Sequence, residues 1–167
     1  MTNIIYDEQE FLELLQLDDE FRKQKKVLSV ENREKYRKLI FYKALVTRQL
    51  HFDSRLEYYD LVNSFLTNEV NREKFFLDLA QIRRRIRLNK ESVFSNIKKK
   101  NKKDNLLTFD CQETSSNFTD LVQEIYTTCQ DFDTYNSDLY EPSEYYTETF
   151  LHNYIKECST KIKSYLD

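Results

Sequence analysis

Glycine is absent from this chain of 167 residues, and proline occurs once, as Pro142. Glycine is the usual residue where the backbone needs a positive φ, as in tight β-hairpins, phosphate-binding loops and many helix ends. The Walker and Rossmann phosphate-binding patterns each need several glycines, so the sequence excludes both. Asparagine must supply the left-handed backbone positions instead, and asparagine is common in this chain.

Tryptophan is also absent and alanine occurs only twice, whereas there are 12 Tyr and 12 Phe. The codons for Gly, Pro and Ala are rich in G and C, so this composition indicates an AT-rich genome, such as that of an organelle or of an AT-rich bacterium. With 40% hydrophobic and 33% charged residues, the chain is long enough to bury one core and too short for two comfortable domains.

We also expect neither a targeting signal nor a disulfide pair. The N-terminal stretch MTNIIYDEQEFLELLQL has acidic residues and lacks the basic region of a signal or transit peptide. No stretch approaches the uncharged apolar length that a transmembrane helix needs. The cysteines Cys111, Cys129 and Cys158 are odd in number and widely spaced, which indicates reduced thiols. We therefore expect a soluble protein without a membrane partner, in a reducing compartment that is either the cytoplasm or the plastid stroma.

Helical periodicity dominates the sequence, and no segment alternates convincingly with a period of two. We predict an all-α fold, a single compact helical bundle of five to six helices with antiparallel neighbours and no sheet. Ser29 is the expected N-cap of a long helix over residues 30–50, and Ser54 with Glu57 has the spacing of a capping box for the next helix. Residues 68–71 are then expected to end that helix and to cap the following one.

Two of the later helices have clear apolar faces. The first carries Phe75, Phe76, Leu79, Ile82 and Ile86. Beyond it, residues 92–105 are expected to form a short helical turn and a solvated loop. The second helix places on one face Phe118, Leu121, Val122, Ile125, Cys129 and Phe132. The last helix is expected to begin at Pro142, because proline is favoured in the first turn.

Charge is divided unevenly along the chain, although the net charge is only −3. Residues 1–103 contain 23 Lys and Arg against 16 Asp and Glu, whereas residues 104–167 contain 3 Lys against 13 Asp and Glu. A basic tract can bind nucleic acid or an acidic protein, and an acidic, tyrosine-rich surface can occupy a basic site. The plainer alternative is that both are solvated helix faces. The basic tract, residues 83–103, includes Arg83, Arg84, Arg85, Arg87, Lys98, Lys99 and Lys100.

No group of residues indicates catalysis or metal binding. His51 and His152 are far apart in the sequence, with His51 expected in a loop, and neither has metal-ligand spacing to a cysteine. No two cysteines have CxxC spacing, and no nucleophile can be matched to an orienting base. We therefore predict a protein that is not an enzyme, with no metal, no cofactor and no small-molecule substrate.

Two stretches carry a family resemblance. The first is FLTNEVNREKFFLDLAQIRRRI, a short loop between two helices followed by an aromatic helix with an arginine-rich end, and it resembles the first part of the colicin D immunity protein-like family. The second is DLVQEIYTTCQDFDTYNSDLYEPSEYYTETFLHNYIKECSTKIKSYL, which is similar to the rest of that family: a helix, an acidic loop ending in a Tyr, and a closing amphipathic helix. The matched residues are 61–88 and 118–166.

The resemblance implies a particular division of the chain and a particular function. The division is an N-terminal helical extension over residues 1–60 and a four-helix core over residues 61–167, with a basic insertion at about residues 89–117. Members of the family bind a tRNA-cleaving toxin domain and block its basic active-site cleft with acidic residues. The implied function is therefore that of a bacteriocin immunity protein, a non-catalytic inhibitor whose partner is a basic nuclease domain. By position, the acidic residues implied for binding are Glu124, Asp131, Asp133, Asp138 and Glu141.

A second function fits the departures from the family pattern. The insertion and the extension are foreign to a minimal immunity protein, and similar domains occur as plastid open reading frames where no toxin is evident. The alternative is a helical accessory or assembly subunit of an organellar complex, which contacts RNA or an acidic partner through its basic tract. Reversing the charge of Asp131 and Asp133 should abolish binding by an inhibitor, whereas reversing the charge of Arg83, Arg84 and Arg85 should matter more for the subunit.

Overall fold

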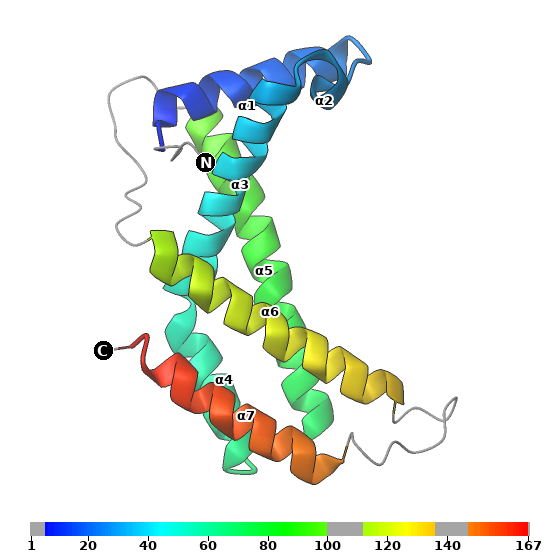
Figure 1. Ribbon diagram of the computed structural model, residues 1–167, viewed down its shortest axis with the longest axis vertical. Helices are drawn as coiled ribbons and strands as arrows, with labels where there is room; N and C mark the ends of the chain where they lie inside the picture. Colours follow the sequence, from blue (N-terminus) through cyan, green and yellow to red (C-terminus); the bar gives the residue numbers. More distant parts are fainter. Residues whose placement is uncertain (1–5, 100–111, 136–146, 167) are drawn as a thin grey trace. The chain divides into compact units, whose positions relative to one another are not determined.

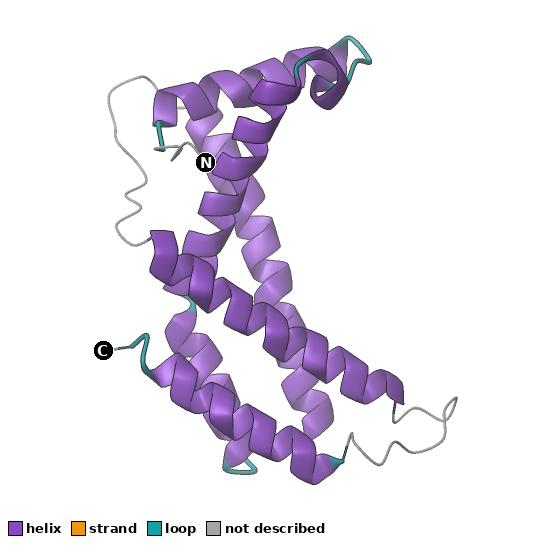
Figure 2. Ribbon diagram, viewed as in Figure 1, coloured by secondary structure: helices purple, strands orange, loops and turns teal. Residues whose placement is uncertain are grey.

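The computed structural model describes residues 6–99, 112–135 and 147–166 (Figure 1). Helices joined by short turns make up these residues, and none of the described residues is in a strand (Figure 2). The predicted all-α class is confirmed, whereas the predicted count of five to six helices is not, because the described residues form seven. The helices are α1 Glu8–Lys23, α2 Leu28–Glu31, α3 Arg33–Asp53, α4 Arg55–Leu66, α5 Arg72–Lys99, α6 Gln112–Tyr135 and α7 Glu148–Lys163.

Asparagine replaces glycine at the turn between α4 and α5, as expected for residues 68–71. Asn68 has a positive φ of 59°, the left-handed conformation that glycine most often takes after a helix. The side chain of Asn71 accepts a hydrogen bond from the backbone N–H of Lys74 at 2.9 Å and so caps the start of α5. A chain without glycine can therefore still reverse direction sharply here.

The predicted start of the long helix is wrong by a few residues. Ser29 lies within the short α2, and α3 begins at Arg33. Asn32 is the residue that caps α3, because its side-chain oxygen accepts a hydrogen bond from the N–H of Lys35 at 3.0 Å. Serine and asparagine are about equally good N-caps. Local propensity therefore did not distinguish the two.

The predicted capping box at the start of α4 does not form. Ser54 precedes α4 as expected, but its side chain makes no capping hydrogen bond to the helix. Glu57, its expected partner, instead forms an ion pair with Arg85 of α5. A long-range charge contact therefore replaces the local one that the spacing predicts.

Helix α5 is much longer than expected. Residues 92–105 were predicted to be a short turn and a loop, yet α5 continues unbroken to Lys99. Phe94 and Ile97 explain the difference, because both are buried, at 5% and 2% exposure. Packing of these two apolar side chains in a core holds the helix through its lysine-rich end. The rest of the predicted loop lies outside the described residues.

The chain divides into two compact units, of which unit 1 comprises Met1–Leu50 and Arg87–Gln112. Its centre is the fully buried ring of Phe11, which meets Tyr42 of α3 and Phe94 of α5 edge-on, with ring centroids 5.5 and 5.6 Å apart. Edge-on aromatic pairs of this kind add to the hydrophobic burial. The buried core residues are Phe11, Leu14, Leu15, Leu28, Leu39, Tyr42, Leu45, Val46, Phe94 and Ile97.

Ion pairs hold the acidic helix α1 to the basic helices of unit 1. Glu10 pairs with Lys38 of α3 at 2.7 Å, and Asp18 lies 3.5 Å from Lys43 of α3. Asp19 pairs with Lys98 of α5. Part of the positive charge that the sequence assigns to the N-terminal half is therefore neutralised within the unit itself.

Unit 2 comprises His51–Ile86 and Glu113–Asp167, which include α4, most of α6, α7 and the first half of α5. Phe118 of α6 is fully buried and meets the rings of Phe52, Tyr58 and Tyr165 edge-on. Helix α4 packs against α7 (Figure 1). The two units divide the chain after residues 50, 86 and 112, which are not the predicted domain boundaries. The predicted division into residues 1–60 and 61–167 stays a prediction.

Candidate functional site

An acidic stripe runs along the outer side of α6. The opposite side of this helix is buried in the core of unit 2, through Phe118, Leu121, Val122, Ile125, Cys129 and Phe132, as the sequence predicted. The stripe consists of Glu113, Asp120, Glu124 and Asp131, which follow one another at intervals of 7, 4 and 7 residues. At 100° per residue these four positions fall within about 40° of one another, over about 27 Å of helix.

The carboxylates of the acidic stripe have no partner within the described part of the chain. Glu113, Asp120 and Glu124 are exposed and Asp131 is half-buried. None of the four forms an ion pair or a side-chain hydrogen bond with a described residue. Their charge is therefore held in a fixed row on a packed helix, where no described residue neutralises it by an ion pair.

Two arginines of unit 2, in contrast, have partners within the unit. Arg72 forms ion pairs with Glu73 at 2.9 Å and with Glu148 at 2.6 Å, so it joins the starts of α5 and α7. The Arg55 side chain donates hydrogen bonds to the backbone carbonyls of Tyr165 and Phe52. Helix α6 itself contains no Lys or Arg, so the charge along it is negative.

The predicted acidic site residues fall into three groups. Glu124 and Asp131 are both in the acidic stripe, two helical turns apart. Asp133 is exposed, but it lies about 160° around α6 from Asp131, so these two residues face different ways. Asp138 and Glu141 lie outside the described residues. The regular spacing of the acidic residues in α6 could have added two further members that the sequence reasoning missed, Glu113 and Asp120.

An aromatic pair on α7 lies beside the acidic stripe. Tyr154 shares a side-chain hydrogen bond with Thr128 of α6, so the two helices meet at this point. Burial raises the pKa of Tyr154 to about 12, and the nearby carboxylate of Glu124 adds to the increase. Phe150 stacks on Tyr154, with ring centroids 6.2 Å apart and 13° between the ring planes, and is 39% exposed. The surface of α6 and α7 is thus both acidic and aromatic.

The residues of the predicted basic tract have separate environments. Arg83 is half-buried, donates a hydrogen bond to Gln123 at 2.7 Å and lies over the ring of Tyr126. Arg85 and Lys98 form the ion pairs with Glu57 and Asp19 given above. Four other basic residues of the tract are described and form no ion pair with a described residue: Lys90 is half-buried, and Arg84, Arg87 and Lys99 are exposed. Lys100 lies outside the described residues.

The histidines are in unlike environments. His51 is not in a loop, as predicted, but in the last turn of α3, where it is 8% exposed. Its Nδ1 lies 2.9 Å from the hydroxyl oxygen of Tyr58. Burial lowers the pKa of His51 to about 4, with a further contribution from Arg83. His152 is exposed on α7, with its ring 6.3 Å from that of Phe65.

Two cavities in unit 2 are lined mainly by polar side chains. One, of about 460 Å³, is lined by residues of α4 and α5 that include Glu57, Asp78 and Arg85. The other, of about 410 Å³, lies by the starts of α5 and α7 and includes Arg72 and Glu148. The charged residues named here already form ion pairs within the chain. Within the described residues, no three His, Cys, Asp or Glu side chains come together in a group that could hold a metal ion.

The described helices include none that combines the length and the apolar character needed to cross a membrane. In comparisons with known proteins, no family model, no curated protein and no solved structure matches this chain.

Proposed function

We propose that this chain is a non-catalytic binding protein that engages a basic surface of a protein partner through the acidic stripe of α6. One observation supports the proposal most directly: the four carboxylates of the stripe are aligned and have no ion-pair partner in the described chain. Aligned charge of one sign speeds encounter with an oppositely charged partner and selects its orientation. The core packing of α6 fixes the row before binding, which reduces the ordering cost.

The partner that fits this surface best is the basic active-site cleft of a ribonuclease, as the resemblance to the colicin D immunity protein-like family implies. A nucleic acid strand presents a row of negative phosphates with aromatic bases beside it. The acidic stripe of α6 provides such a row, and the stacked rings of Phe150 and Tyr154 lie next to it. The chain would then act as an inhibitor by occupying the cleft in place of RNA.

Charge reversal on two sides of α6 tests the proposal. The chain is used for affinity capture from its native source at ~100 mM and ~500 mM salt, with protein and RNA in the eluate both identified. The double variant Glu124→Lys with Asp131→Lys should weaken capture of a basic nuclease by about a hundredfold or more. Asp133→Lys is compared with Asp131→Lys alone as its matched control, because each reverses one acidic charge on the same helix and Asp133 faces away from the stripe.

Either of two results would contradict this proposal. Equal loss of binding in the Asp133→Lys control and in Asp131→Lys would show that net charge matters and the stripe does not. Capture of RNA, or of an RNA-containing assembly, that survives the double variant would favour the alternative function.

The alternative is an accessory subunit that contacts RNA or an acidic partner, and it is favoured by one observation. Arg84, Arg87 and Lys99 are exposed and form no ion pair with a described residue. The variant Arg84→Glu with Arg87→Glu should abolish RNA capture by such a subunit and leave nuclease capture unchanged. The same substitutions at Arg83 or Arg85 are poor tests, because these two arginines make contacts within the chain that the substitutions would also remove.

A further inference from the structure

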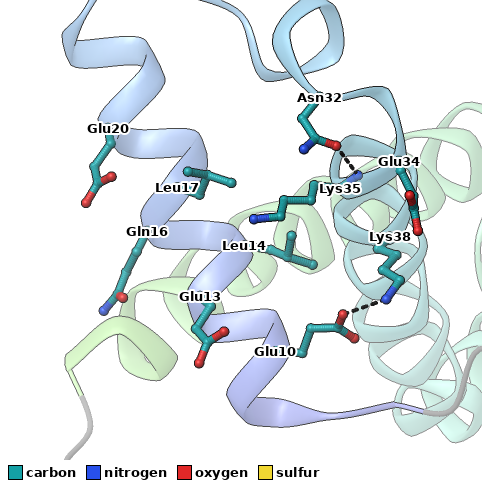
Figure 3. Close-up of a pocket in the computed structure, with 10 residues that line it drawn as sticks. All are labelled: Glu10, Glu13, Leu14, Gln16, Leu17, Glu20, Asn32, Glu34, Lys35 and Lys38. Atoms are coloured by element: carbon teal, nitrogen blue, oxygen red, sulfur yellow. Dashed lines mark hydrogen bonds and ion pairs between the residues drawn. The ribbon is translucent and has the colours of Figure 1, made fainter.

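A groove in unit 1 lies between α1 and α3, well away in sequence from the acidic stripe of α6 (Figure 3). It has a volume of about 400 Å³. Leu14 and Leu17 of α1 point into the gap between the two helices and form its floor, and the Glu10–Lys38 ion pair closes one end (Figure 3). Two helices with apolar side chains between them are the usual seat for a third, amphipathic helix.

The rims of this groove are acidic. Glu13, Gln16 and Glu20 lie along α1 on the outer side of the two leucines, and Glu34 lies on α3 (Figure 3). The three glutamates are exposed, and none of them forms an ion pair with a described residue. Glu10, Asp18 and Asp19 of α1 have lysine partners, as described above, whereas Glu13 accepts a hydrogen bond from the neutral Gln9 at 3.0 Å. The groove therefore holds three glutamates whose charge no described lysine or arginine neutralises by an ion pair.

Lys35 is the exception to this charge pattern. Its side chain extends from α3 across the gap toward the two leucines (Figure 3). Its backbone N–H is held by Asn32, but its ammonium group makes no ion pair with a described residue. In the unbound chain the Lys35 side chain therefore covers part of the apolar floor (Figure 3). Because a flexible lysine side chain without an ion pair can change rotamer at little cost, Lys35 can move out of the groove.

We propose that this groove binds a basic amphipathic helix of a protein partner. The narrow apolar stripe of that helix packs on the half-buried Leu17, above the buried Leu14, and its lysines or arginines face Glu13, Glu20 and Glu34. Glu13 and Glu20 are seven residues apart, which is about 10.5 Å along α1. A partner helix aligned with α1 therefore presents basic residues at positions i and i+7 on one edge. Lys35 swings aside on binding. The proposal is independent of the acidic stripe of α6, which belongs to unit 2.

A synthetic helical peptide of about 18 residues provides the probe. It carries leucines at the a and d positions of a heptad, lysines on both flanks, and one tryptophan in the apolar stripe. The full chain contains no tryptophan, so the emission of the peptide reports binding directly. A second peptide in which glutamate replaces every lysine is the charge control. We expect the basic peptide to bind with a blue-shifted emission and the acidic peptide not to bind.

Three variants of the full chain make the expected result specific. Glu13→Gln with Glu20→Gln should weaken binding about three- to tenfold, the effect of removing two partly solvated ion pairs. Lys35→Ala should strengthen binding about two- to fivefold, because it removes a positive charge that repels the basic peptide and uncovers the apolar floor of the groove. Glu91→Gln should change affinity by less than about twofold, since Glu91 is exposed on α5 and does not line the groove. Circular dichroism and melting temperature confirm that each variant is folded.

Several results would overturn the proposal. The groove is not the site if neither peptide binds, or if Glu91→Gln weakens binding as much as the Glu13 and Glu20 substitutions. Loss of binding only in Glu124→Gln with Asp131→Asn would place the peptide on the acidic stripe of α6 instead. Binding of spermidine at the groove, without binding of the peptide, would make the ligand a small polycation and not a helix. A loss of affinity in Lys35→Ala would also contradict the proposed role of that side chain.

Discussion

The guanidinium carbon of Arg83 lies 3.8 Å from the centroid of the Tyr126 ring, and one of its terminal nitrogens donates a hydrogen bond to Gln123 at 2.7 Å. Arg83 of α5 is thus attached to α6 by a stacking contact and a hydrogen bond, without a carboxylate. Of the three consecutive arginines Arg83, Arg84 and Arg85, the first is therefore a structural residue of unit 2.

Replacing Arg83 should therefore destabilise the fold, whereas replacing its neighbour should not. Arg83→Ala loses the cation–π contact and the Gln123 hydrogen bond, which together contribute about 1 kcal/mol to the free energy of unfolding. This contribution is at the low end of the usual range for two such contacts, because burial of the Arg83 Nη1, which has no hydrogen-bond partner in the described structure, offsets part of it. Arg84→Ala removes an exposed side chain and should change stability by less than about 0.5 kcal/mol. Urea unfolding followed by circular dichroism distinguishes them, and equal stabilities would contradict the structural role of Arg83.

His51 should make the stability of the protein depend on pH. Burial lowers the pKa of His51 to about 4 in the folded chain, whereas an unfolded histidine has a pKa near 6.5. At pH 7 both states are neutral at this residue. As the pH falls from about 6.5 to about 4 the unfolded state gains a proton first, so the free energy of unfolding should fall by roughly 3 kcal/mol. Urea unfolding at pH 7 and at pH 4.5 measures the change.

The variant His51→Gln isolates this effect from the titration of carboxylates. Glutamine keeps a polar group near the hydroxyl of Tyr58 but has no proton to gain. The loss of stability between pH 7 and pH 4.5 should be smaller in His51→Gln by most of the histidine contribution. His152→Gln serves as the control, because His152 is exposed. The buried, neutral state of His51 would be refuted by equal pH profiles in wild type and His51→Gln.

Two adjacent aspartates of α1 should differ in their contribution to stability. Asp18 is 8% exposed and lies 3.1 Å from Arg22 and 3.5 Å from Lys43. Asp19 is more exposed and pairs with Lys98 at the surface. Asp18→Asn should cost about 1–3 kcal/mol, because it leaves the partly buried Lys43 without its counter-charge. Asp19→Asn should cost less than about 1 kcal/mol. Chemical denaturation of both variants tests this order, and a larger effect at Asp19 would contradict it.

The apolar face of α6 could be predicted from the sequence because it depends only on helical spacing. Six residues at three- and four-residue steps were assigned to one face, and all six are buried. The same helical period also determines the acidic stripe on the other side, so Glu113 and Asp120 were within reach of that reasoning. Asp133 was assigned to the site by resemblance to a family, and helix geometry places it on another side of α6 from Asp131.

The continuation of α5 and the distribution of its positive charges could not be predicted in this way. Composition suggested that the lysine-rich segment would leave the helix, but burial of Phe94 and Ile97 among side chains of α1 and α3 holds it helical. The partners of Arg85 and Lys98 are 28 and 79 residues away in the sequence. Which basic residues are neutralised internally is therefore decided by tertiary packing, which local spacing does not contain.

The reactivity of the buried thiols of α6 and α7 measures whether these two helices, which form the candidate binding surface, stay packed together. Cys129 and Cys158 are 3% and 1% exposed. Burial raises the pKa of Cys129 to about 12, and it also raises that of Cys158. Because the thiolate is the reactive form, alkylation of Cys129 by iodoacetamide at pH 8 should be slowed roughly a thousandfold by the pKa alone.

Mass spectrometry of the Cys111→Ser variant tests this protection with only these two thiols present. We expect neither Cys129 nor Cys158 to be alkylated in the native protein within an hour, and both to be alkylated in urea. If the native protein were alkylated at Cys129 or Cys158 as fast as the protein in urea, α6 and α7 would have to separate readily. The acidic stripe and the Phe150–Tyr154 pair would then not form one fixed surface. A bound partner should slow native alkylation further, because it can bind only the closed arrangement that buries both thiols.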